Sequence, residues 1–223
     1  MNSKIYSICV VGGTGAEGGG LALRWAKHGH RVTIGSRDVE KAKAAAAELN
    51  ARLGSELVLS AESTEGVLSA DIVVLTVPFS GQLPTVEGLK QALQGKILID
   101  VTVPLVPPKV SKVQLPESDS CVVAVQRLLG EQVRVVSAFQ NVSAHKLKNL
   151  DHEIDCDVLV AADDKDARLT GIELARHAGL RGIDVGVLAN SVVAESLTSA
   201  LIWINKFYKV PDSGIRITGL PTE

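Results

Sequence analysis

The chain has 223 residues, of which 46% are hydrophobic and 22% are charged, and its formal net charge is -2. A chain of this length can bury a substantial core, as one large domain or one domain with a modest appendage. Nucleic acids and anionic membrane surfaces usually require a clustered basic excess, so the charge argues against both as main partners. Cys9, Cys121 and Cys156 form no C-x-x-C motif, and residues 197–204 are too short to cross a bilayer. We therefore expect a soluble, cytoplasmic protein.

The first predicted strand, residues 5–11, runs directly into a glycine-rich turn. The turn has the sequence Gly13-Thr14-Gly15-Ala16-Glu17-Gly18, which fits G-x-G-x-x-G. In this pattern one glycine makes a tight turn, one lets the backbone approach a pyrophosphate, and one lets helix and strand pack closely. Glycine clusters alone are usually simple turns, but here a helix over residues 16–27, a C-cap at Gly29 and a strand over residues 31–34 follow. This β-α-β unit predicts a dinucleotide site with the pyrophosphate at the helix N-terminus.

The end of the second predicted strand selects the nucleotide. A site for NAD would place Asp or Glu there, about 20 residues beyond the glycines, to bind the ribose 2′-OH. This chain instead has Ser36 and Arg37, with Lys41 one helical turn later. A hydroxyl and two cations suit a 2′-phosphate, so we predict NADP(H). The alternative is that Arg37 and Lys41 only belong to the solvated face of the next helix, with Asp38 as its N-cap.

Helices and strands then alternate along the chain. Helices are predicted over residues 38–53, 64–70, 83–93 and 121–129, and strands over residues 56–60, 71–77, 96–100 and 133–138. Residues 106–119 contain prolines and no clear period, which predicts a loop on the ligand side of the sheet. The alternation predicts an α/β fold, a Rossmann-type doubly wound parallel sheet.

The remainder is predicted to be a small C-terminal helical and βαβ extension. A strand, a helix and a strand are expected over residues 157–161, 165–177 and 182–187, before a long helix over residues 189–208. We expect this helix to close over the sheet, with Trp203 and Phe207 in the core or in an interface. The predicted domains are residues 1–140, an NADP-binding Rossmann domain, and residues 141–223, a smaller region that closes over the coenzyme site.

Together these motifs resemble those of the NADPH-dependent reductases of the deazaflavin coenzyme F420. The resemblance covers nearly the whole chain, although its nucleotide motifs are shared with other Rossmann reductases. Its most specific part is Asn190-Ser191 followed by Glu195-Ser196-Leu197-Thr198. The other matching segments are Gly12-Gly13-Thr14-Gly15, Gly29-His30, Gly35-Ser36-Arg37 with Lys41, residues 74–78 and Val136-Ser137-Ala138.

The resemblance implies two co-substrates, NADP(H) and coenzyme F420. With the glycine motif, it assigns cofactor binding to Gly13, Thr14, Gly15, Ala16, Glu17, Gly18, Ser36, Arg37, Lys41, Val77, Pro78, Val103 and Ala144. It places the deazaflavin against Val103, Gln140, Val142 and Ser213. Gln140 stands where relatives carry histidine, and its amide can still donate a hydrogen bond to a ring carbonyl.

No side chain is predicted to act as a catalytic acid or base, and no metal site is predicted. His145 is the nearest candidate acid, but a lone histidine at a helix start is more often a surface or capping residue. Hydride transfer between a nicotinamide and a deazaflavin mainly needs the two rings stacked and water excluded. The cations that could steer the acidic tail of the coenzyme are Lys109, Lys112 and Arg216, although a solvated surface charge is the favoured interpretation of each.

Three functions remain open from the sequence. The first is a deazaflavin:NADP oxidoreductase, the second an NADPH-dependent reductase of a small carbonyl or imine, and the third a non-catalytic NADPH-sensing module. The third is disfavoured because residues 101–105 and 140–144 would build an apolar pocket beside the nicotinamide, which a sensor does not need. We expect small-molecule coenzymes as partners, no nucleic acid and no membrane, and a homodimer is one of the open oligomeric states.

Overall fold

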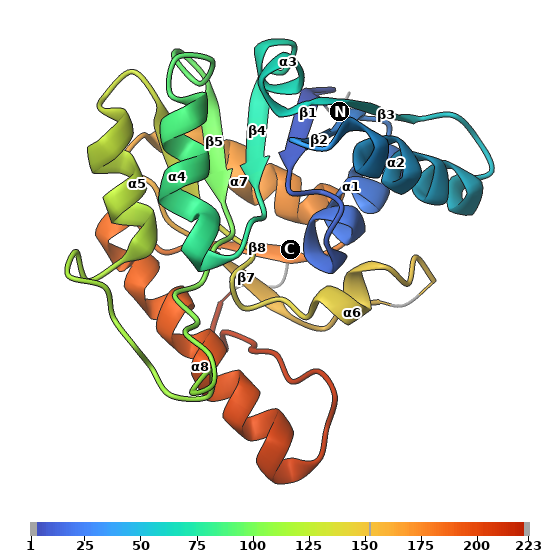
Figure 1. The fold of residues 1–223 in the computed structure, drawn as a ribbon. Helices are drawn as coiled ribbons and strands as arrows, with labels where there is room; N and C mark the ends of the chain where they lie inside the picture. The colour runs from blue at the N-terminus through green and yellow to red at the C-terminus, as the bar shows by residue number, and fades with distance from the viewer. Residues whose placement is uncertain (1–3, 152, 221–223) are drawn as a thin grey trace.

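The structure is a computed structural model that describes residues 4–151 and 153–220. Six parallel strands form its central sheet, in the order β3-β2-β1-β4-β5-β6 (Figure 1). They are β1 (Ser7–Val11), β2 (Arg31–Ser36), β3 (Val58–Glu62), β4 (Ile72–Leu75), β5 (Ile97–Asp100) and β6 (Arg134–Ser137). Strand β1 lies in the middle of the sheet, with β2 and β3 on one side of it and β4, β5 and β6 on the other. This order confirms the predicted doubly wound Rossmann sheet.

Helices cover both faces of this sheet (Figure 1). They are α1 (Ala16–His28), α2 (Val39–Leu53), α3 (Ser63–Leu68), α4 (Phe79–Leu89), α5 (Cys121–Leu129), α6 (Ala144–Leu147), α7 (Lys165–His177), the short 3-10 helix η1 (Leu188–Asn190) and α8 (Ser191–Tyr208). Because side chains alternate along a strand, Ile8 and Val10 pack with α1, α2 and α7, while Cys9 and Val11 pack with α3, α4 and α5. Among the described helices, none has the length and apolar character needed to span a membrane.

The C-terminal part adds a second, two-stranded parallel sheet of β7 (Asp157–Val160) and β8 (Arg181–Asp184). An antiparallel bridge between Ser137 and Ala161 links this sheet to the end of β6. One hydrophobic cluster contains both Trp25 of α1 and Leu174 of α7. The core on the α1 face of the sheet is therefore shared by residues on both sides of the predicted domain boundary at residue 140. The division into two domains stays a prediction.

Two predicted helices differ most from the structure. The helix expected over residues 83–93 lies at Phe79–Leu89, with Pro78 as its N-cap. Pro84 lies inside this helix, although proline is typical of the first position of a helix. The long C-terminal helix packs on the body through residues up to Leu201, and α8 then extends away from the sheet (Figure 1). Trp203 and Phe207 are 55% and 65% exposed in the single chain. The prediction of core positions for them is therefore wrong, which leaves the alternative of an interface.

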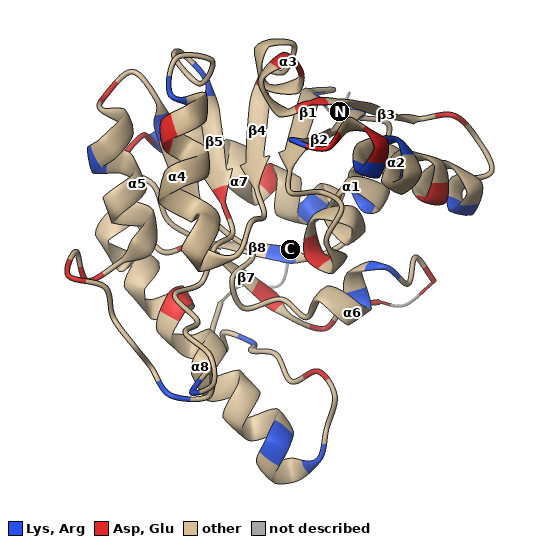
Figure 2. Ribbon diagram, in the orientation of Figure 1, with Lys and Arg blue, Asp and Glu red and all other residues tan. Residues whose placement is uncertain are grey.

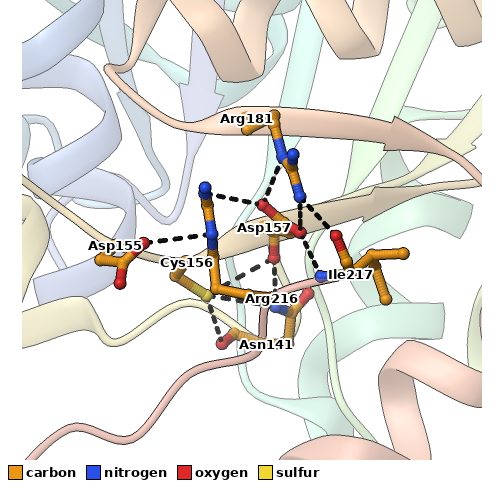
Figure 3. Close-up of polar contacts among 7 residues, drawn as sticks. All are labelled: Asn141, Asp155, Cys156, Asp157, Arg181, Arg216 and Ile217. Atoms are coloured by element: carbon orange, nitrogen blue, oxygen red, sulfur yellow. Dashed lines mark hydrogen bonds and ion pairs between the residues drawn. The ribbon is translucent and has the colours of Figure 1, made fainter. Parts of the chain in front are cut away.

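A buried carboxylate fastens the C-terminal segment to β7 (Figure 3). Asp157 is fully buried and accepts two hydrogen bonds from Arg181, at 2.8 and 2.6 Å. It also accepts one from Arg216 at 3.1 Å and one from the N–H of Ile217 at 2.6 Å. Burial alone would raise the pKa of Asp157, but the hydrogen bonds and charges of these donors hold that pKa below its usual value.

Replacing this carboxylate should destabilise the fold. We expect Asp157→Asn to lower the free energy of unfolding by about 3–5 kcal/mol, because it removes the fully buried negative charge that pairs with Arg181 and Arg216. The control is Asp155→Asn, which removes the other ion pair of Arg216 at a site whose side chain is 81% exposed, and it should cost less than about 1 kcal/mol. Urea unfolding of both variants checks this, and equal losses would contradict it.

Candidate functional site

The predicted site segments lie in loops at the carboxyl edge of the six-stranded sheet. The glycine turn follows β1, Ser36 ends β2, and residues 76–78, 101–103 and 138–144 follow β4, β5 and β6. Strands β1 and β4 are neighbours, yet the chain leaves them toward opposite sides of the sheet. In doubly wound sheets, ligands bind in the crevice at such a switch point.

The glycines of the turn have separate structural roles. A Cβ atom at Gly13 would lie 2.8 Å from Ile34 Cδ1, and a Cβ at Gly18 would lie 2.8 Å from Gly13 Cα and collide with Thr76. Both positions therefore allow α1 to pack against the sheet. A Cβ at Gly15 would meet only Gly12 O, at 3.4 Å, so its other side is open. Gly15 is thus the glycine above which another molecule can approach the backbone.

Glu17, in the first turn of α1, is a half-buried acid. Its Oε1 atom is buried and has no hydrogen-bond partner within the described residues, and burial raises the pKa of Glu17 to about 8. Helical spacing places Glu17 on the face of α1 that carries Gly20 and Arg24. That face meets α6, because a Cβ at Gly20 would lie 2.5 Å from Leu147 Cβ and Arg24 donates to Leu147 O at 2.9 Å. Sequence patterns identified Glu17 only as part of the glycine turn.

The residues expected to bind a 2′-phosphate gather at the end of β2. Arg37 and Lys41 are exposed, and Ser36 Oγ accepts a hydrogen bond from the N–H of Asp38 at 3.1 Å. Asp38 is the N-cap of α2, as expected, and Lys41 Nζ lies 3.5 Å from its carboxylate. Arg37 also lines a cavity of about 420 Å³ beside α3 and α4. The other lining residues are Glu62, Ser63, Thr64, Ser80, Gly81, Pro84, Thr85, Gly88 and Leu89.

A buried polar network lies at the end of β5. The Asp100 carboxylate accepts hydrogen bonds from Gln82 Nε2 at 2.6 Å and from the N–H of Thr102 at 2.9 Å. Burial raises the pKa of Asp100 to about 6, although both hydrogen bonds oppose the rise. Gln140 donates to the Asp100 carbonyl at 2.8 Å, and its Oε1 has no partner among the residues described. One amide hydrogen of Gln140 is thus engaged within the protein, and its role toward a ligand stays a prediction.

The loop after β6 turns through an unusual backbone position. Phe139 has a φ of 74°, in the left-handed region that side chains other than glycine rarely adopt. Its ring is fully buried and packs edge-to-face on Trp25, with ring centroids 5.7 Å apart. Burial of this ring offsets the local strain. The turn leads into Gln140 and the buried Val142, and no sequence pattern predicted it.

The Asn-Ser and Glu-Ser-Leu-Thr motif of α8 holds this loop in place. Glu195 is buried and accepts from the hydroxyl of Ser120 at 2.6 Å and from the N–H of Cys121 at 2.9 Å, at the N-terminus of α5. Ser191 shares a hydrogen bond of 2.6 Å with Ser120. Thr198 donates to the carbonyl of Gln140 at 2.7 Å. The motif therefore acts by positioning α5, α8 and the loop after β6.

The C-terminal turn meets this loop through Cys156. A Cβ at Gly214, next to Ser213, would lie 2.8 Å from Cys156 Sγ, and Asn141 Nδ2 lies 3.5 Å from the same sulfur (Figure 3). Ser213 is thus near the loop after β6, and its role toward the deazaflavin stays a prediction. Arg216 is paired with Asp155 and Asp157, so its charge is engaged within the protein, and a role in steering a ligand stays a prediction.

Of the remaining candidates, Lys109 and Lys112 lie exposed in the loop after β5, and His145 is exposed on α6. Val77 borders the glycine turn, because a Cβ at Gly12 would lie 3.0 Å from its Cγ1. Pro78 is exposed, and Val103 and Ala144 are half-buried. The structure thus brings the glycine turn, Val77, Val103 and the loop after β6 to one edge.

Comparisons with known proteins found a matching family model and similar relatives that align over nearly the whole chain. Residues 7–104 match a family model described as NADP oxidoreductase coenzyme F420-dependent. The F420-dependent NADP reductase of Methanothermobacter thermautotrophicus is 40% identical over 98% of this chain and 97% of its own length. That of Methanocaldococcus jannaschii is 40% identical over 96% of this chain and 98% of its own length.

Solved structures share the fold. A protein from Arthrobacter sp. FB24, assigned as an F420-dependent NADP-reductase, superimposes with a TM-score of 0.79 and 25% identity, over 96% of this chain and 99% of its own. A pyrroline-5-carboxylate reductase from Coxiella burnetii has a TM-score of 0.62 and 19% identity, over 92% of this chain and 68% of its own. At that identity the second likeness indicates the fold alone.

The half-buried Glu17 of the glycine turn should make stability depend on pH. Between about pH 4.5 and 8, the folded chain keeps the proton of Glu17 while the unfolded chain loses it, so stability should fall as the pH rises through this window. The fall should exceed about 1.4 kcal/mol, the worth of one pKa unit. Glu17→Gln cannot ionise and should lose this part of the fall, as urea unfolding at several pH values would measure. Glu40→Gln, at an exposed position of α2, is the control, and identical profiles for wild type and Glu17→Gln would contradict the prediction.

Proposed function

The chain belongs to the family of coenzyme F420-dependent NADP oxidoreductases, and from this premise we propose that it transfers a hydride between NADP(H) and F420 at the carboxyl edge of the six-stranded sheet. One observation carries the location. The open glycine turn, the exposed cations Arg37 and Lys41, and the loops after β5 and β6 share that edge at the switch point. A dinucleotide lying across such a crevice reaches from the end of β2 to the far strands.

We propose that the phosphates of NADP(H) are bound at two places. The pyrophosphate lies above Gly15, where a Cβ would otherwise project and where the first N–H groups of α1 are available. The 2′-phosphate lies against Ser36, Arg37 and Lys41, at a strand end that has no acid for a ribose 2′-OH. The cavity of about 420 Å³ beside Arg37 suits the adenosine end.

The nicotinamide then extends past Val77 and Pro78 toward Val103 and Ala144. Val77 lies beside the glycine turn, so a nucleotide that passes the turn comes next to the loop after β4. We propose that Val103, Val142, Gln140 and the turn at Ser213 form the deazaflavin side of the same space. The contact of Gly214 and Asn141 with Cys156 supports bringing these segments together.

The chain contributes positioning rather than a reacting side chain. When both coenzymes are bound, the hydride passes directly between their rings, so the protein has to hold the rings in register and exclude water. The hydrogen bond from Thr198 and the buried ring of Phe139 fix the loop that carries Gln140 and Val142. His145 is exposed on α6, which gives no support to a carbonyl reductase that uses it as an acid.

We propose further that two copies associate through the outer half of α8. Trp203, Phe207 and Tyr208 are 55%, 65% and 68% exposed, and few charged residues interrupt this half of the helix (Figure 2). An apolar face of this kind commonly marks an interface, and homodimers are the commonest assemblies. A cytoplasmic location fits Cys9, Cys121 and Cys156, which are buried and unpaired.

Nucleotide preference tests the phosphate site. Arg37→Ala should weaken NADPH binding by about 1.5–3 kcal/mol, the worth of hydrogen bonds to charged groups, and barely change NADH binding. Lys43 is an exposed cation on α2. Lys43→Ala is therefore the matched control and should change the binding of neither nucleotide. Fluorescence titration with both nucleotides measures this. Equal losses of affinity for NADPH and NADH in Arg37→Ala would contradict the assignment of the 2′-phosphate site.

Two variants test the second coenzyme site. Val142→Trp should fill the stacking space and lower F420 reduction more than about tenfold while NADPH binding is retained, because only the ring geometry is lost. His145→Ala should lower turnover less than about tenfold, since loss of a general acid typically costs 10²–10⁴. Absorbance of F420 during turnover and NADPH titration give the two readouts. A larger loss of turnover in His145→Ala than in Val142→Trp would favour a carbonyl reductase.

A further inference from the structure

Three histidines meet at the amino edge of the sheet, opposite the coenzyme loops. His28 ends α1, His30 lies just before β2, and His177 ends α7. One ring nitrogen from each lies within 4.8 Å of those of the other two. We propose that these histidines bind one divalent transition-metal ion, with zinc as the best fit.

His30 and His177 already form the core of such a site. His30 Nε2 and His177 Nδ1 lie 2.9 Å apart, so one proton is shared between them. A tetrahedral zinc ion with bonds of about 2.0–2.1 Å separates two nitrogens by about 3.3–3.4 Å. Opening the pair by a few tenths of an ångström would therefore let an ion take the place of that proton.

Binding has an identifiable cost. The N–H of Tyr6 donates to His30 Nδ1 at 3.1 Å, which puts the ring proton of a neutral His30 on Nε2. With the ion on Nε2, this proton moves to Nδ1 and the bond from Tyr6 is lost. Two N–H groups would then point at each other, so the His30 ring has to shift away from the Tyr6 N–H as the ion binds.

The second nitrogen of His177 supports the same assignment. His177 Nε2 is buried without a hydrogen-bond partner in the described part of the chain, and it lies 3.8 Å from Glu173 Oε1. The other oxygen of Glu173 accepts from the Tyr6 hydroxyl at 2.7 Å. A histidine that binds metal through one nitrogen usually donates its other N–H to a carboxylate. Glu173 is placed for that role if His177 binds through Nδ1.

His28 supplies the third ligand and the opening to solvent. Its ring is stacked on His177 with centroids 3.9 Å apart, so it must rotate to point a nitrogen at the ion. It is exposed at the last position of α1, which permits the rotation. A cavity of about 320 Å³, lined in part by Lys27, His28 and His177, leads to this point and leaves room for a water as fourth ligand.

The donor set selects the kind of ion. Imidazole nitrogens suit zinc, nickel and copper, whereas magnesium and calcium prefer oxygen ligands. The site joins α1 and the start of β2 to the end of α7, and it is remote from the coenzyme loops. Zinc bound there fastens α7 to the main sheet and takes no part in hydride transfer.

The test uses the full chain without any histidine tag, freed of metal by a chelator. Calorimetric titration with zinc chloride should give one ion per chain with a micromolar or lower Kd, and zinc should raise the Tm. Cobalt(II) as a coloured substitute should give the strong visible bands of a tetrahedral site. Glu173→Gln should weaken zinc binding by about 10–100-fold, as expected for a carboxylate behind a ligand.

The decisive variant is His28→Gln, because its side chain is exposed and the fold should not depend on it. It should weaken zinc binding at least tenfold and abolish the zinc-dependent rise in Tm, with NADPH binding unchanged. The control is His145→Gln, an exposed histidine on α6, which should bind zinc as wild type does. Wild-type zinc affinity in His28→Gln, an equal loss in His145→Gln, or no tetrahedral cobalt bands would each overturn the proposal.

Discussion

The close packing of α1 on the sheet is the constraint on which the coenzyme site depends. It exists because Gly13 and Gly18 have no side chains where a Cβ would collide with Ile34 and Thr76. With α1 that close, its first N–H groups face the crevice between β1 and β4, and Gly15 leaves the space above them open. A single methyl group at either packing glycine would move the helix end that the proposed pyrophosphate site requires.

A second set of contacts positions the opposite wall of the crevice. The loop after β6 depends on a strained Phe139, a hydrogen bond from Thr198, and the donation by Gln140 to the end of β5. Each contact comes from a different element, so the loop is fixed by the assembled fold rather than by its own sequence. This is how a chain can place two flat rings against each other without a catalytic side chain.

Sequence patterns predicted the parts of the fold that local chemistry decides. Asp38 caps α2, Gly29 and Gly54 end helices in the left-handed conformation, and α5 and α7 have the predicted bounds. What escaped prediction depends on distant contacts. The exposed Trp203 resembles a core residue in a helical pattern, and the positive φ of Phe139 follows from its packing on Trp25. The histidine cluster has no spacing signature, because His177 lies far from His28 and His30 in the chain.

The burial of Glu17 connects the two walls. Its carboxyl lies on the face of α1 that meets α6, and its pKa near 8 leaves it mostly uncharged at neutral pH. An ionised carboxylate at the start of α1 would repel a pyrophosphate bound at the same helix end. Arg37 and Lys41, in contrast, lie exposed at the rim, where the 2′-phosphate is proposed to bind. An uncharged Glu17 and exposed cations at the rim suit the proposed binding of an anionic dinucleotide, and any change that ionises Glu17 should weaken that binding.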